Sequence, residues 1–104
     1  MDKKTDRLIR QFIAAAAKEY TDLKIAYIFG SYARNNEKPD SDIDIALFIE
    51  NLNDADRLDL QVKLFLIASK FDTRIEPHPI PYQDFFLNNP FAAEIKKTGI
   101  EITI

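Results

Sequence analysis

Two aspartates alternate with isoleucines at the start of an apolar run, in segment 42–49, which reads DIDIALFI. A run of this length that is rich in β-branched residues predicts a strand. Residues two apart in a strand face the same side, so Asp42 and Asp44 should project together while Ile43 and Ile45 enter the core. Neighbouring carboxylates repel each other, and a fold keeps such a pair most readily around a cation. The segment therefore predicts a strand with a metal site on one face.

Oxygen ligands and the lack of cysteine indicate a hard cation, Mg²⁺ or Mn²⁺, at this site. The alternative is an exposed edge strand on which the two aspartates have no role, although aspartate is disfavoured within strands. Asp40 has the same parity as Asp42, but it follows Pro39, where a role in a turn is the better interpretation.

A Gly-Ser pair, Gly30-Ser31, directly follows a second predicted strand over residues 24–29 (KIAYIF). A turn that opens a helix, here a short one over roughly 31–35 that Asn35 would end, leaves backbone N–H groups free to bind phosphate. Gly30 would let a phosphate approach closely, and Ser31 would add a hydroxyl donor. Taken alone, the pair is better interpreted as a simple turn with a serine N-cap, so a phosphate-binding role depends on the aspartates that follow.

A third carboxylate, Glu76, lies on a predicted strand over residues 73–78 (TRIEPH). If this strand lies beside the one that carries the paired aspartates, Glu76 completes a cluster of three carboxylates. Asp72 has the same parity and is the rival, and a surface glutamate paired with Arg74 is the alternative. His78 is the only histidine, and between two prolines we expect it to pack in a turn rather than to bind a metal.

The rest of the chain predicts an α/β domain that spans residues 1–104. Apolar residues at helical spacing predict a helix over 5–20, with Thr5 as N-cap, and a second helix over 54–70. One or two short helices are expected within 82–97, divided near Pro90, and the last residues alternate like a short strand.

The composition of the chain limits which binding partners and which cellular compartment we expect. The net charge is −3 and no block of lysine and arginine stands out, so nucleic acid is not expected to be a main partner. The start of the chain is charged and has no apolar run of signal-peptide or membrane-spanning length. We therefore expect a cytoplasmic protein that does not enter a membrane.

Segment 30–44, GSYARNNEKPDSDID, resembles the signature of the nucleotidyltransferase superfamily related to DNA polymerase β. In that signature, a Gly-Ser pair is followed by ten residues and then by Asp-x-Asp. Ala33-Arg34 and the later segment 75–80 (IEPHPI) are similar to the minimal nucleotidyltransferases, called MNT domains. The resemblance implies an α+β fold in which a small mixed sheet is flanked by helices.

The resemblance also implies roles for individual residues. The triphosphate of a nucleotide would be held by Gly30, Ser31 and Arg34, and ATP is the expected donor. Two metal ions, Mg²⁺ with Mn²⁺ as the alternative, would be bound by the catalytic residues Asp42 and Asp44.

Glu76 occupies the position of the family's third carboxylate, which is a metal ligand and the expected catalytic base. Many relatives have aspartate there, so the longer side chain changes the geometry of the base. Many relatives also have glycine where this chain has Asn35, and we expect that difference to be harmless.

The implied reaction is attack by an acceptor hydroxyl on the α-phosphorus of ATP, with pyrophosphate leaving. Many minimal members resemble antitoxins that adenylylate a tyrosine of a separate HEPN protein, and a HEPN toxin is therefore the expected partner. The alternatives are an antitoxin that neutralises its partner by binding alone and a stand-alone enzyme for a small molecule. The aromatic segment 82–91 would either offer a docking patch or cap the sheet.

Overall fold

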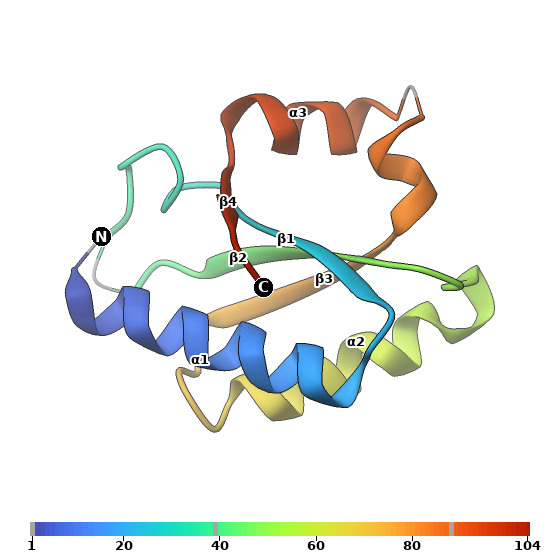
Figure 1. Cartoon of the computed structure of the whole chain (residues 1–104). Coiled ribbons are helices and arrows are strands. Elements are labelled where there is room, and N and C mark those ends of the chain that lie inside the picture. Colours follow the sequence, from blue (N-terminus) through green and yellow to red (C-terminus); the bar gives the residue numbers. More distant parts are fainter. Residues whose placement is uncertain (1, 39, 88) are drawn as a thin grey trace.

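The computed structural model describes residues 2–38, 40–87 and 89–104, which form a four-stranded sheet with helices on both faces (Figure 1). The strand order is β3-β2-β1-β4; β2 and β3 are parallel, and the other neighbours are antiparallel. This mixed sheet confirms the predicted α+β class. In chain order the elements are α1 (Lys3–Glu19), β1 (Leu23–Phe29), β2 (Ile43–Ile49), α2 (Asp54–Ala68), β3 (Ile75–Pro81), the 3₁₀ helix η1 (Tyr82–Phe85), α3 (Pro90–Thr98) and β4 (Ile100–Ile102).

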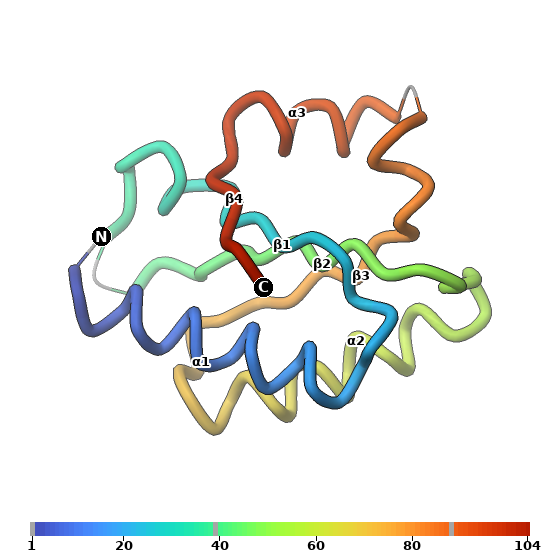
Figure 2. Tube along the Cα trace, in the orientation of Figure 1, coloured from blue at the N-terminus to red at the C-terminus, as the bar shows by residue number. Residues whose placement is uncertain are grey.

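Helices α1 and α2 lie against one face of the sheet, and α3 lies on the other face, as the ribbon and the chain trace both show (Figure 1, Figure 2). The strand β2 alternates as predicted, because Ile43, Ile45 and Leu47 are fully buried in the core on the side of α1 and α2. On the opposite face, Ala46 and Phe48 are buried in a smaller core together with residues of α3. The residue that precedes this smaller core on the same face of β2 is Asp44.

The first helix begins earlier than its sequence pattern predicts. Asp2, not Thr5, is the N-cap of α1, because its carboxylate accepts a 2.7 Å hydrogen bond from the Thr5 N–H. Thr5 is instead buried within the first turn, and its hydroxyl accepts a hydrogen bond from Arg74. The prediction of Thr5 as N-cap is therefore wrong.

The third strand extends further than predicted, through the proline-rich segment to Pro81. β3 is an edge strand, where proline is tolerated because no ladder hydrogen bond is lost. The carbonyls of Pro77 and Pro79 accept hydrogen bonds from the side chains of Gln61 and Arg57 on α2. The edge of β3 that faces α2 is therefore the one on which Pro77 and Pro79 lack N–H groups. Side chains of α2 satisfy the carbonyls of these two prolines.

The second helix has apolar side chains on two sides. Leu64 and Ala68 are buried against the sheet, while four apolar residues of the outer side are 47–72% exposed. We call these four the outer face of α2: Leu58, Val62, Phe65 and Leu66. In the described part of the chain, no helix is long and apolar enough to cross a bilayer.

The aromatic segment after β3 is divided between the interior and the surface. Phe85 packs against Tyr27 and Phe48, with ring centroids 6.2 and 5.2 Å away, and so caps the smaller core. Phe86 and Phe91 remain exposed. Of the one or two short helices that the sequence predicts here, divided near Pro90, two are present: η1 and α3, which begins at Pro90.

Candidate metal and nucleotide site

Two of the three predicted carboxylates lie opposite each other on neighbouring strands. The parallel pairing of β2 with β3 places Asp44 directly beside Glu76. Phe29, the residue before the Gly-Ser pair, lies on the other side of Asp44, because β1 pairs with β2 in antiparallel fashion. Like charges in direct register destabilise a sheet, so this arrangement is typical of a site that binds a cation.

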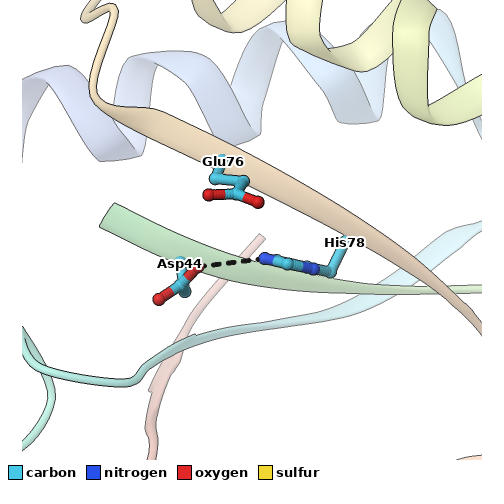
Figure 3. Close-up of side chains that lie close together, drawn as sticks. All are labelled: Asp44, Glu76 and His78. Atoms are coloured by element: carbon cyan, nitrogen blue, oxygen red, sulfur yellow. Dashed lines mark hydrogen bonds and ion pairs between the residues drawn. The ribbon is translucent and has the colours of Figure 1, made fainter. Parts of the chain in front are cut away.

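His78 joins these carboxylates in a three-residue cluster (Figure 3). Its Nε2 atom lies 3.0 Å from the Asp44 Oδ1 atom, and one ligand atom from each of Asp44, Glu76 and His78 can be chosen so that all three lie within 4.8 Å of one another. The prediction that His78 packs in a turn is wrong because β3 continues through the prolines and directs every second side chain to the face of Asp44. The signal in the sequence was the shared parity of Glu76 and His78.

Asp42 lies outside that cluster. It comes one residue before β2 begins at Ile43, and it is exposed. Together with Glu76 it lines a groove of about 300 Å³ between the β3 edge and α2. The groove also contains Leu58, Val62 and Phe65 of the outer face of α2. Of the predicted carboxylates, Asp42 and Glu76 therefore line this groove, whose far wall is apolar, whereas Asp44 does not.

Gly30 leaves room for the carboxylate of Asp44. Its backbone has a φ of +74°, in the left-handed region, and a Cβ atom at this position would lie 2.7 Å from the Asp44 Oδ2 atom. A side chain would therefore strain the backbone and displace the Asp44 carboxylate from its position. The structure thus gives Gly30 a role in placing Asp44, a predicted metal ligand, in addition to the phosphate approach that the sequence predicts.

Replacing Gly30 by alanine should damage both stability and ion binding. The left-handed backbone would cost a non-glycine residue about 1–3 kcal/mol, and the displaced Asp44 should weaken Mn²⁺ binding several-fold. Urea unfolding and calorimetric titration of Gly30→Ala with MnCl₂ measure the two effects. Unchanged stability together with unchanged Mn²⁺ affinity would contradict this role.

The Gly-Ser turn is a tight turn, and the short helix predicted for 31–35 does not form. The Arg34 and Asn36 N–H groups donate to the carbonyls of Gly30 and Ser31. Asn35 ends the turn with a φ of +58°, a conformation that glycine and asparagine both adopt. This explains why asparagine can stand where relatives have glycine. Arg34, the third residue predicted to bind the triphosphate, is exposed on this turn.

Asp72, the rival for the third carboxylate, lies in a different network. Its two carboxylate oxygens accept hydrogen bonds of 3.0 and 2.6 Å from the Nε and Nη2 atoms of Arg74. These bonds lower the pKa of Asp72 below its ordinary value and raise that of Arg74. Arg74 also donates a 2.7 Å hydrogen bond to the hydroxyl of Tyr32, in the turn after Ser31. The network therefore connects the start of β3 to the Gly-Ser turn.

Replacing Asp72 by asparagine should destabilise the fold by about 1–3 kcal/mol at pH 7. Because the folded-state pKa of Asp72 is depressed, its contribution is present above the unfolded pKa, near pH 4, and is lost as the pH falls through the folded value. The difference in unfolding free energy between wild type and Asp72→Asn should therefore shrink below about pH 4. Urea unfolding at several pH values measures it, and a difference that is independent of pH would contradict the ion pair.

Comparisons with known proteins agree with this fold. The family described as polymerase beta, nucleotidyltransferase matches residues 11–103. A candidate nucleotidyltransferase from Sulfolobus solfataricus has a similar structure, with a TM-score of 0.64 and 20% identity over 91% of this chain and 76% of that chain. A chain of a toxin–antitoxin complex with AMP-PNP gives a TM-score of 0.59 and 23% identity over 88% of this chain and 70% of that chain. No significant match was found among curated proteins.

The match to the family covers most of the chain. The chain therefore belongs to the polymerase beta nucleotidyltransferase family, and its small mixed sheet with flanking helices is the fold of that family.

Proposed function

We propose that this protein is a metal-dependent nucleotidyltransferase that transfers AMP from ATP to an acceptor hydroxyl. The observation that carries the proposal is the register of β2 with β3, which sets Asp44 opposite Glu76, together with Gly30, whose missing side chain leaves room for Asp44. Membership of the family supports the same class of reaction.

The residues present fit a divalent cation. Asp44 and Glu76 offer carboxylate oxygens on adjacent strands, which is the ligand type that Mg²⁺ and Mn²⁺ prefer. Asp42 is exposed two residues before Asp44, so no packing holds its side chain away from an ion at the site. When bound, the ions would offset the charge that develops on the attacking and leaving oxygens.

The chain's own groups would place the substrates. The turn that begins at Gly30-Ser31 would hold the triphosphate, with the exposed Arg34 as its cationic contact. Glu76 lies at the groove and would accept the proton of the acceptor hydroxyl as that oxygen attacks the α-phosphorus. The acceptor oxygen would attack in line with the bond to the leaving group, and departure of pyrophosphate would complete the transfer.

The acceptor that we propose is a tyrosine of a HEPN toxin, which would make this protein an antitoxin. One solved structure with a similar fold comes from a toxin–antitoxin complex with AMP-PNP. The outer face of α2 supports a protein acceptor because three of its exposed side chains line the same groove as Glu76. A partner that covers this face would bring a hydroxyl to the carboxylates.

Incubating the protein with α-labelled ATP, Mg²⁺ and the proteins encoded by its neighbouring genes tests this function. The expected result is labelled AMP on a tyrosine of the partner, and none with Asp44→Asn. Binding of the partner without any label would support an antitoxin that acts by contact alone. A lone monomer that efficiently modifies a small alcohol would contradict the antitoxin proposal.

A further inference from the structure

We infer that His78 is a ligand of the metal, so that the site binds Mn²⁺ and other first-row transition ions in preference to Mg²⁺. The inference rests on the proposed function, because it concerns the same site. The inference adds one nitrogen ligand to the proposed carboxylates, and with it a preference among ions that carboxylates alone do not provide.

The position of His78 is that of a ligand held in place. It lies two residues after Glu76 on the same face of β3, and its register partner on β2 is Ala46, whose methyl group leaves space above the strand. The Phe29 ring packs against the imidazole at 61°, with the ring centroids 5.1 Å apart. The imidazole thus points its Nε2 atom at Asp44 (Figure 3).

The spacing of the donor atoms fits an octahedral ion. Two adjacent ligands of an ion with bonds of about 2.1 Å lie about 3.0 Å apart. The Asp44 Oδ1 and His78 Nε2 atoms are separated by 3.0 Å, so an ion could replace the hydrogen bond between them with little movement. The cluster spreads over at most 4.8 Å, whereas opposite ligands of such an ion lie about 4.2 Å apart. Glu76 would therefore close in by at most about 1.8 Å, the difference between the 4.8 Å spread and the spacing of adjacent ligands.

The types of donor atom then determine which ion the site prefers. Mg²⁺ binds oxygen ligands and keeps several waters, whereas imidazole is a ligand of transition metals. An imidazole nitrogen next to two carboxylates should therefore add affinity for Mn²⁺ and leave that for Mg²⁺ nearly unchanged. The competing interpretation is that His78 only donates a hydrogen bond to Asp44.

The substitution His78→Gln separates the two interpretations, because its amide can still donate a hydrogen bond to Asp44 but is a poor metal ligand. Titrate the untagged wild-type protein and the variant with MnCl₂ and with MgCl₂ by calorimetry. We expect wild type to bind Mn²⁺ at least about tenfold more tightly than Mg²⁺. The variant should lose at least about tenfold in Mn²⁺ affinity and less than about threefold in Mg²⁺ affinity.

A second readout uses the fact that His78 is the only histidine in the chain. Its imidazole resonances in an NMR spectrum should broaden at substoichiometric Mn²⁺, and they should stay sharp, with small shifts, when Mg²⁺ is added. Equal losses for both ions in His78→Gln would overturn the inference while leaving the proposed function standing. Imidazole signals that Mn²⁺ leaves unchanged would place the ion away from Asp44 as well, because His78 lies 3.0 Å from that carboxylate, and would overturn both. A folded wild-type protein that binds neither ion would overturn both.

Discussion

Asp44→Asn should abolish metal-dependent nucleotide binding and lower the rate of transfer by at least about a thousandfold. Asp44 faces the two other members of the cluster from the neighbouring strand, in register with Glu76 and within hydrogen-bond distance of His78. Asparagine keeps the size of the side chain but removes the charge that holds the ion. The loss of several kcal/mol of metal-dependent stabilisation corresponds to a rate effect of this order. Calorimetry with ATP and Mg²⁺ and a labelled-AMP assay measure the two losses.

The matched control is Asp59→Asn, which makes the same chemical change on the exposed side of α2, where Asp59 pairs with Lys63. It should leave binding and transfer within about twofold of wild type, because an exposed ion pair contributes little. If Asp44→Asn retains both activities, the ion is not held at the register of β2 with β3.

Glu76→Gln should lower the rate of transfer by about 100- to 10,000-fold, which is the usual contribution of a general base. The affinity for ATP and Mg²⁺ should change much less, because Asp44 and Asp42 remain. The comparison with Asp44→Asn, which should damage both binding and rate, separates the base from the main metal ligand. Single-turnover rates and calorimetric affinities measured on the same preparations make the comparison.

Asp72→Asn is not a neutral control for Glu76, because Asp72 holds Arg74 and through it Tyr32. Its effect should appear in stability, and transfer below the unfolding temperature should be nearly normal. If Asp72→Asn abolishes transfer in a folded protein while Glu76→Gln does not, the assignment of the base is wrong. Transfer that survives both substitutions would place the activating group on the partner or on the metal.

The sequence predicts the strands that carry the site better than it predicts the ends of the elements. Alternating carboxylates and isoleucines in segment 42–49 determine both the strand and its buried face, and Ile43 and Ile45 are buried as expected. The end of β3 could not be predicted, because proline is unfavourable in most strands. Only the edge position and the hydrogen bonds from Arg57 and Gln61 show why it is tolerated here.

Local spacing likewise predicts part of the candidate site. The pairing of Asp44 with Glu76 was conditional on two strands being neighbours, and the structure confirms that they are. The contact between Gly30 and Asp44 depends on a tertiary distance of 2.7 Å, which no spacing in the sequence encodes. His78 has the right parity, but the prolines on either side of it favoured a turn. The exposed position of Asp42 also depends on where β2 begins.

The most direct test of the account is the affinity for ATP measured by calorimetry with and without Mg²⁺. A site built from Asp44 and Glu76 should repel the triphosphate unless a cation is present, so Mg²⁺ should strengthen binding by at least about tenfold. Asp44→Asn should remove that dependence. Equal affinity for ATP in the presence and absence of Mg²⁺, or no binding by a folded protein, would contradict the account.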